Sequence, residues 1–419
     1  MPDLPVSRRT FLAGAAGAAG VTAIAAHRPI ERALGLSKAD RSTPTATATP
    51  SSTGVLVVVT LYGGNDGLNT VVPAGDPAYQ KARADLAYQP NQVLNLGDGL
   101  GLNPGMTGFK TLWDDNRLAV VRGVGYPNPD HSHFRSMAIW QTASPGTSVP
   151  TGWLGRWLDA TGDNPLLAVS VEPVLPPLLA GQRAAAVSLP VNGLTMPAGQ
   201  LGEAFRALGQ TQSGDSVQTA RAARSVVDLQ EAVRVLGGAV HGATPSANPQ
   251  QPQQKQQNRG ALGDQLDLVA ELVEAGVPTR AYSVSLGGFD THADEKATQQ
   301  RLLTELDGAL VPFVERMGRT TRGQQVVVLA YSEFGRRVTA NAGQGTDHGT
   351  AGPVFLMGAG VKGGFYGEQP SLTDLNAGDL KENTDFRSIY ATLLDKVLDT
   401  DPGRVLTDYS GRLDSVLST

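Results

Sequence analysis

The chain of 419 residues contains no cysteine. Without a thiol there can be no disulfide, no cysteine-ligated zinc or iron–sulfur site and no cysteine nucleophile. Aromatic residues make up only 5% of the sequence, whereas it has 50 glycines and 27 prolines. This composition favours a fold with many tight turns over a long helical bundle. With a net charge of −5, the chain also lacks the basic excess of a protein that binds nucleic acid.

The N-terminal 26 residues have the features of a twin-arginine export signal. The pair Arg8-Arg9 precedes the run Ala13–Ala26, which is too short and too rich in glycine and alanine to span a membrane. We therefore predict a signal peptide over 1–26 that engages the twin-arginine export machinery. The mature protein is then periplasmic, at the cell surface or extracellular, with no stable membrane anchor after cleavage. The alternative is a chance arginine pair in an ordinary amphipathic start.

Two low-complexity segments divide the rest of the chain. Residues 27–53 end in a tract of Ser, Thr, Pro and Ala that cannot bury a core, so this segment is predicted to be a disordered linker. Residues 245–258 are polar and rich in glutamine, and we expect a disordered, solvated loop because core-like segments lie on both sides. The remainder, 54–419, is predicted to be a single α/β hydrolase-like domain.

Four segments, mostly apolar and rich in β-branched residues, are predicted to be strands buried on both faces: Val55–Leu61, Leu118–Val124, Arg280–Ser285 and Val326–Ala330. Helical patterns fall between them, over Pro104–Asp115, Ser213–Leu236, Gly263–Ala275 and Asp294–Met317. This alternation predicts an α/β fold, a three-layer sandwich with a mostly parallel central sheet. In such folds ligands bind beyond the carboxyl ends of the strands.

Histidines and carboxylates gather just beyond the predicted strands and in nearby loops. The candidate metal ligands are Asp66, His131, His133, Asp290, His292, Glu333, Asp347 and His348. Imidazole nitrogen combined with carboxylate oxygen suits zinc or manganese, so we expect one or two divalent ions at this edge of the sheet. Such an ion can activate a hydroxyl and neutralise charge on a transferring phosphoryl or sulfuryl group.

Two residues next to the first histidine pair are candidate catalytic groups. Ser132 lies between His131 and His133 and can serve as a metal-activated nucleophile. Arg135 can hold the oxygens of an anionic substrate through paired hydrogen bonds. The alternative for Ser132 is that it caps the helix that starts near Phe134.

Each candidate ligand also has a purely structural interpretation. Asp66 can be an ordinary turn residue, and Asp290 can cap the helix that follows it. Glu333 can form an ion pair with Arg336 or Arg337, and the histidines can be surface or loop residues. Their shared position at strand ends favours one common polar site.

Five short motifs stand out in the folded part of the chain: Leu61–Asn69 (LYGGNDGLN), His131–Phe134 (HSHF), Gly152–Arg156 (GWLGR), Ser332–Arg336 (SEFGR) and Thr346–Gly349 (TDHG). Together they resemble a large bacterial family, the domain-of-unknown-function family 1501, whose members are often exported by the twin-arginine route. The resemblance covers the chain from about Gly54 to the C-terminus. That family is in turn similar to the alkaline phosphatase and sulfatase superfamily, which implies the same layered α/β fold.

The superfamily pattern implies roles for individual residues. It places a metal aspartate at Asp66, the nucleophile near Ser132, a metal aspartate–histidine pair at Asp290 and His292, and a last metal histidine at His348. The resemblance thus implies that these residues form the active site.

One departure from the superfamily pattern concerns the second ion. The pattern implies another aspartate–histidine pair at 332–334, where Phe334 stands and no histidine occurs. A second ion would therefore need a substitute ligand from His131, His133 or Asp347.

The predicted function is an exported metal-dependent hydrolase that acts on small anionic esters of phosphate or sulfate. The alternative is a non-catalytic metal- or carbohydrate-binding protein that keeps the fold. A redox enzyme is disfavoured, because the sequence has neither a dinucleotide-binding fingerprint nor a haem attachment motif.

Overall fold

The computed structural model describes residues 54–418, apart from 163, 194–195 and 243–258. The predicted signal peptide, linker and glutamine-rich loop lie outside the described residues, so they stay predictions. The chain divides into two units. The smaller contains α6 (Gly199–Leu208) and the start of α7 (Val217–Gly242). Within the described ranges every helix is too short or too polar to cross a bilayer.

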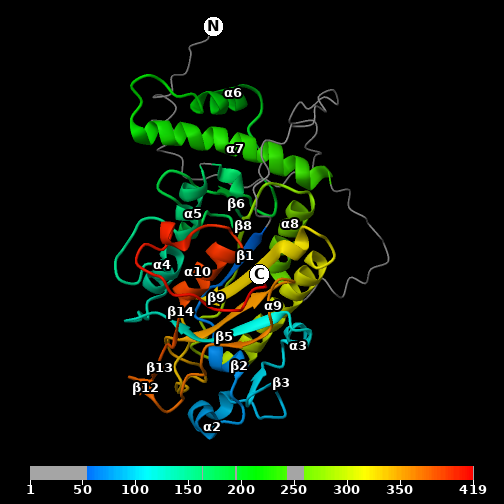
Figure 1. The fold of residues 1–419 in the computed structure, drawn as a ribbon, viewed down its shortest axis with the longest axis vertical. Helices are drawn as coiled ribbons and strands as arrows, with labels where there is room; N and C mark the ends of the chain where they lie inside the picture. Colours follow the sequence, from blue (N-terminus) through cyan, green and yellow to red (C-terminus); the bar gives the residue numbers. More distant parts are fainter. Residues whose placement is uncertain (1–53, 163, 194–195, 243–258, 419) are drawn as a thin grey trace. The chain divides into compact units, whose positions relative to one another are not determined.

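A nine-stranded sheet forms the centre of the larger unit, in the order β11-β5-β10-β9-β1-β8-β6-β7, with β14 paired to β5 (Figure 1). β1 (Val55–Leu61) pairs in parallel with β8 (Ala281–Leu286) and β9 (Val326–Ser332). β10 (Gly352–Met357) is antiparallel to both β9 and β5 (Leu118–Gly125). Consequently β5 runs in the same direction as β1, and the predicted class, α/β with a mostly parallel sheet, is confirmed.

Some shorter strands complete the central sheet, and others form two small separate sheets. The remaining strands of the central sheet are β6 (Ala168–Ser170), β7 (Val187–Ser188), β11 (Gly364–Tyr366) and β14 (Thr384–Asp385). A three-stranded sheet comprises β2 (Val71–Val72), β3 (Leu94–Gly97) and β4 (Leu100–Leu102), and a hairpin comprises β12 (Leu375–Asn376) and β13 (Asp379–Leu380). These short strands have too few residues for a period to be recognised in the sequence.

One face of the sheet packs against an aromatic-rich helical layer. α4 (His133–Thr142), α5 (Trp153–Thr161) and α10 (Phe386–Lys396) share a buried core with Leu56 and Val58, alternate residues of β1. Because side chains alternate across a strand, the intervening buried valines of β1 face the opposite layer.

The opposite layer consists of three helices. α8 (Gly260–Glu274) contacts β8 and packs along α9 (Glu295–Met317), which also contacts α3 (Thr107–Asp114). Figure 1 shows these helices on one side of the sheet and α4, α5 and α10 on the other. The three layers match the sandwich expected from the sequence.

The GWLGR motif is part of the framework of the fold. A Cβ atom on Gly155 would lie 2.2 Å from the carbonyl carbon of Ala180, so the backbone of α5 directly touches that loop. Trp153 is fully buried. Arg156 donates hydrogen bonds of 2.7–2.8 Å to three backbone carbonyls, those of Thr142, Thr151 and Val405. The motif therefore ties α5 to the loops around it.

We predict that Gly155→Ala lowers the free energy of unfolding by at least about 2 kcal/mol, because the added methyl group overlaps backbone atoms. Gly146→Ala is the matched control, since nothing lies within 4 Å of its added Cβ. We expect that variant to stay within about 0.5 kcal/mol of the wild type. Urea unfolding of all three proteins measures both effects, and equal stability of the two variants would contradict the close packing of α5.

Candidate metal centre

The topology brings four loops to one edge of the sheet. Three of them leave the carboxyl ends of the parallel strands β5, β8 and β9, and they carry His133, Asp290 and Glu333 respectively. The fourth carries His348 and leads into β10, which starts at this edge because it runs antiparallel to its neighbours. The strand directions alone thus place these residues near one another.

Three imidazole nitrogens surround one carboxylate oxygen at this edge. Ligand atoms of His133, Asp290 and His348 all lie within 4.8 Å of one another. Oδ1 of Asp290 is 3.4 Å from Nε2 of His133 and 3.2 Å from Nε2 of His348. Nε2 of His292 joins them, at 3.0 Å from Oδ1 of Asp290 and 2.9 Å from Nε2 of His348. This is the donor set of a site for a divalent metal ion.

The hydrogen bonds on the other side of two rings fix their tautomers. Nδ1 of His348 lies 2.7 Å from the carbonyl oxygen of His131, which can only accept, so Nε2 of the neutral ring carries a lone pair. Nδ1 of His133 bonds to the carboxylate of Glu333 at 2.8 Å, which leaves Nε2 buried with no hydrogen-bond partner in the described chain. Burial lowers the pKa of His348, which favours the neutral ring. Two lone pairs and a carboxylate therefore converge, an arrangement that a cation satisfies.

Glu333 orients the ring of His133 and is not one of the converging ligand residues. Its side chain is 2% exposed, and Oε1 accepts from both His133 Nδ1 and the backbone N–H of Gly63, the latter at 2.9 Å. Oε2 lies 2.9 Å from the hydroxyl of Ser332. An outer carboxylate that holds the far nitrogen of a ligating imidazole is a common second layer of metal sites.

Arg336, which the sequence did not single out as a site residue, joins several of these loops. Its buried guanidinium donates to the carbonyl oxygens of Gly63, Gly64, Phe289 and Thr346. Nη2 also lies 2.9 Å from Oδ1 of Asp290. Burial raises the pKa of Asp290, but the hydrogen bonds with Arg336 and His348, together with the charge of Arg336, outweigh it and the pKa falls to about 2. The acidic partner of Arg336 is therefore Asp290, not Glu333.

Phe334 occupies the position where the superfamily pattern implies a second-site histidine. Its ring is nearly buried and its centroid lies 4.9 Å from that of His133 and 4.8 Å from that of His348. The ring thus supports both imidazoles by packing and supplies no ligand atom. Within the described chain, one group of three or more converging ligand residues is found.

Asp66, predicted as a metal ligand, is bound to an arginine. Its fully buried carboxylate accepts hydrogen bonds of 2.6 and 2.8 Å from Arg83, the last residue of α2 (Pro77–Arg83). Burial raises the pKa of Asp66, but the charge of Arg83 and the hydrogen bonds from Glu295 and Arg83 together outweigh it, and the pKa is lowered. We therefore leave Asp66 out of the candidate centre, because its oxygens already serve a buried cation.

Glu295 adds a second carboxyl group to this buried cluster, and no local feature of the sequence marks it. Oε2 accepts from the hydroxyl of Thr346 at 2.5 Å, and Oε1 lies 3.8 Å from Nη1 of Arg83. Burial, together with the negative charge of Asp66, raises the pKa of Glu295 far above its usual range. Two carboxyl groups thus share one arginine, Asp66 as the anion and Glu295 in its protonated form.

Two further predicted ligands lie beside the converging group. Nε2 of His131 is 2.8 Å from Oδ2 of Asp379, so this ring nitrogen is engaged away from the other histidines. Oδ1 of Asp347 lies 3.6 Å from Nδ1 of His292 and accepts from the side-chain amide of Asn341 at 3.2 Å. Both residues stand around the centre and not among its converging atoms.

The two predicted catalytic residues lie at the start of α4. Ser132 is the N-cap residue, as the structural alternative expected, but its side chain makes no capping hydrogen bond. Arg135 lies two residues after His133, which puts its side chain roughly 200° around the helix axis from the ligand. The hydroxyl of Ser132 is therefore not used to cap α4, and Arg135 does not converge with the histidines.

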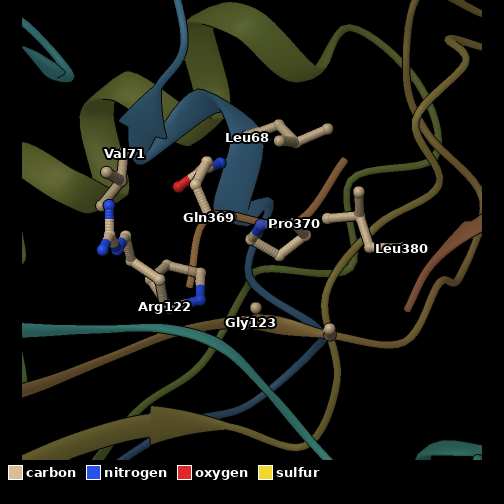
Figure 2. Close-up of a pocket in the computed structure, with 11 residues that line it drawn as sticks. Leu68, Val71, Arg122, Gly123, Gln369, Pro370 and Leu380 are labelled. Atoms are coloured by element: carbon tan, nitrogen blue, oxygen red, sulfur yellow. The ribbon is translucent and has the colours of Figure 1, made fainter. Parts of the chain in front are cut away.

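A small pocket near η2 (Gly67–Asn69) is separate from the candidate centre. Apolar side chains such as Leu68, Pro370 and Leu380 line it together with Arg122 (Figure 2). Its volume of about 30 Å³ has room for about one water molecule, and none of the candidate ligands lines it. The chemistry-bearing residues lie instead on the exposed loops at the sheet edge.

Comparisons with known proteins find one matching family and several solved structures of low similarity. Residues 54–417 match a family described as "Protein of unknown function (DUF1501)". No curated protein matches the sequence. A solved protein of the alkaline phosphatase superfamily from Vibrio parahaemolyticus is similar at 10% identity and a TM-score of 0.38, over 84% of this chain and 67% of that one.

Two more solved structures show the same level of similarity. The zinc complex of the C-terminal periplasmic domain of EptC from Escherichia coli has 10% identity and a TM-score of 0.33, with 72% of each chain covered. The phosphonate monoester hydrolase of Agrobacterium radiobacter has 11% identity and a TM-score of 0.33, over 86% of this chain and 78% of that one. Any activity of this chain has to be inferred from its own side chains.

We predict that Glu295→Gln reduces the loss of stability at alkaline pH. The pKa of Glu295 is raised on folding. Its contribution to the unfolding free energy is therefore complete below the unfolded pKa of about 4.5, and this contribution is lost as the pH rises through the folded pKa. The amide stays neutral and removes this titration. Between about pH 5 and pH 9 the variant should therefore lose on the order of 2 kcal/mol less unfolding free energy than the wild type.

Urea unfolding at several pH values measures this difference. Parallel pH profiles for the wild type and Glu295→Gln would show that Glu295 is already ionised in the folded protein.

Proposed function

This chain belongs to the DUF1501 family of proteins of unknown function, and we propose that it is a metal-dependent hydrolase of phosphate or sulfate esters. The observation that carries the proposal is the convergence of the Nε2 lone pairs of His133 and His348 on the carboxylate of Asp290. Nitrogen and oxygen donors of this kind suit zinc or manganese. We propose one such ion, held by these three residues with His292 as the fourth ligand.

The proposed nucleophile is the hydroxyl of Ser132. It adjoins the ligand His133 in the chain, and it is not used to cap α4. A divalent ion at the centre would lower the pKa of an attacking hydroxyl and offset the negative charge that develops on the transferring group. The first N–H groups of α4 favour an anionic oxygen at the same place, because they are the positive end of the helix.

The surroundings of the ligands suit an ester that enters from solvent. The side chains of Asp290 and His292 are 50% and 45% exposed, whereas the residues that orient the site, Glu333 and Arg336, are buried. Exposed ligands on a buried polar support allow substrate access while the geometry stays fixed. Arg135 is assigned the lesser role of attracting an anionic substrate by its charge.

We predict that the wild-type protein binds one divalent ion, zinc or manganese, per chain. His348→Ala and Asp290→Ala each remove a ligand and should weaken binding by more than about 100-fold. The matched control is Asp374→Ala, because Asp374 is 73% exposed and pairs with Lys381 outside the centre. Metal analysis after dialysis, followed by titration, measures this series. A wild-type protein that holds no ion after incubation with zinc and manganese would overturn the proposed centre.

We predict chelator-sensitive hydrolysis of at least one class among aryl phosphates, phosphate diesters and aryl sulfates. Ser132→Ala should lower kcat by about 1,000-fold or more because the nucleophile is lost. Ser144→Ala, at the other end of α4, is the control and should retain activity. Turnover that survives both chelation and Ser132→Ala would contradict the mechanism. Stoichiometric metal without any hydrolysis would favour the non-catalytic binding protein.

A further inference from the structure

We propose that Asp379 is a positioning residue of the metal centre and that it acts through His131. This proposal rests on the metal centre of the proposed function. Asp379 belongs to the β12–β13 hairpin, which is remote in the sequence from every candidate ligand. No motif and no strand-end position marked it in the sequence.

The environment of Asp379 is unusual for a carboxylate. The residue is 4% exposed, although a buried carboxylate is stable only with donors or cations around it. Oδ2 accepts from Nε2 of His131 at 2.8 Å. Oδ1 is buried without a hydrogen-bond partner in the described chain and lies 3.6 Å from Nε of Arg337. His131 and Arg337 are thus the two groups that hold this carboxylate in place.

His131 links Asp379 to two ligands of the centre. Its carbonyl oxygen accepts from Nδ1 of His348 at 2.7 Å, and this bond directs the opposite nitrogen of that ring toward Asp290. The ligand His133 follows two residues later and starts α4. By fixing the ring of His131, Asp379 fixes the segment that supplies one ligand and orients another.

The hairpin itself is tied to the loop that carries His348. The hydroxyl of Thr350 donates to the carbonyl oxygen of Leu380 at 2.5 Å. Arg337, the second group near Asp379, donates its backbone N–H to the carbonyl oxygen of Asp347 at 3.0 Å. Asp379 therefore connects the loop after β5, which carries His131, to the loop between β9 and β10, which carries Arg337 and His348. The predicted metal-ligand role of His131 gives way to a supporting role, since Nε2 is already bonded to Asp379.

The test uses the full chain and cobalt(II), whose visible absorption reports the geometry of its ligands. Asp379→Ala removes the bond to His131 and should weaken cobalt and zinc binding by about 10- to 100-fold and change the cobalt spectrum. Asp379→Asn keeps an oxygen that accepts from Nε2 of His131, so it should retain most of the affinity and the wild-type spectrum. Asp374→Ala, an exposed aspartate just before the same hairpin, is the control and should change neither.

The outcomes separate this inference from the proposed function. If Asp379→Ala keeps wild-type affinity and spectrum while His348→Ala loses binding, the positioning role is overturned and the metal centre stands. A wild type that binds neither ion overturns both. If Asp379→Ala does not fold, His131→Ala tests the same link from its other end, and an unchanged spectrum in that variant would overturn the inference. A folded His131→Ala with weakened binding and a changed cobalt spectrum supports it.

Discussion

The buried guanidinium of Arg336 is the interaction on which the rest of the site depends. A cation taken out of water needs an acceptor for each of its N–H groups. Arg336 finds five oxygens, four from backbone carbonyls and one from Asp290. These oxygens come from the loops after β1 and β8 and from the loop before β10, where the backbone has left the sheet and its carbonyls need donors. The strands determine where these loops begin, and Arg336 determines where they come together.

A second buried arginine explains why Asp66 does not reach the histidines. Arg83 takes the carboxylate of Asp66 and also donates to the backbone carbonyls of Arg337 and Val338, directly after Arg336. The same short segment is thus held by both arginines. Of the acids that the sequence brought together, Asp66 neutralises Arg83 and Glu333 orients a ring, which leaves Asp290 to offer an oxygen to three imidazoles.

The sequence was informative about the sheet and about the edge where the site lies, because both depend on local patterns. Continuous β-branched runs predict buried parallel strands, and β1 is found over the same residues as expected, 55–61. The local patterns did not predict which acidic residue would bind which arginine and which one would face the histidines. Asp66 and Asp290 both follow glycine-rich turns, and only the tertiary fold brings Arg83 to one and Arg336 to the other. Asp379 lies on a two-residue strand, which has no period to recognise, and the antiparallel direction of β10 is set by long-range pairing.

Phe334 has a consequence for the chemistry of the proposed hydrolase. Its ring packs against the rings of His133 and His348 and offers no ligand atom for a second ion. With one ion, part of the negative charge that develops during transfer must be offset by the protein itself. The uncapped start of α4 is suited to this, because its first N–H groups adjoin both Ser132 and a ligand, and because backbone dipoles fixed in advance need no reorganisation when the charge appears. In this arrangement Phe334 stabilises the orientation of the two ligands, and the helix terminus adds positive potential next to Ser132.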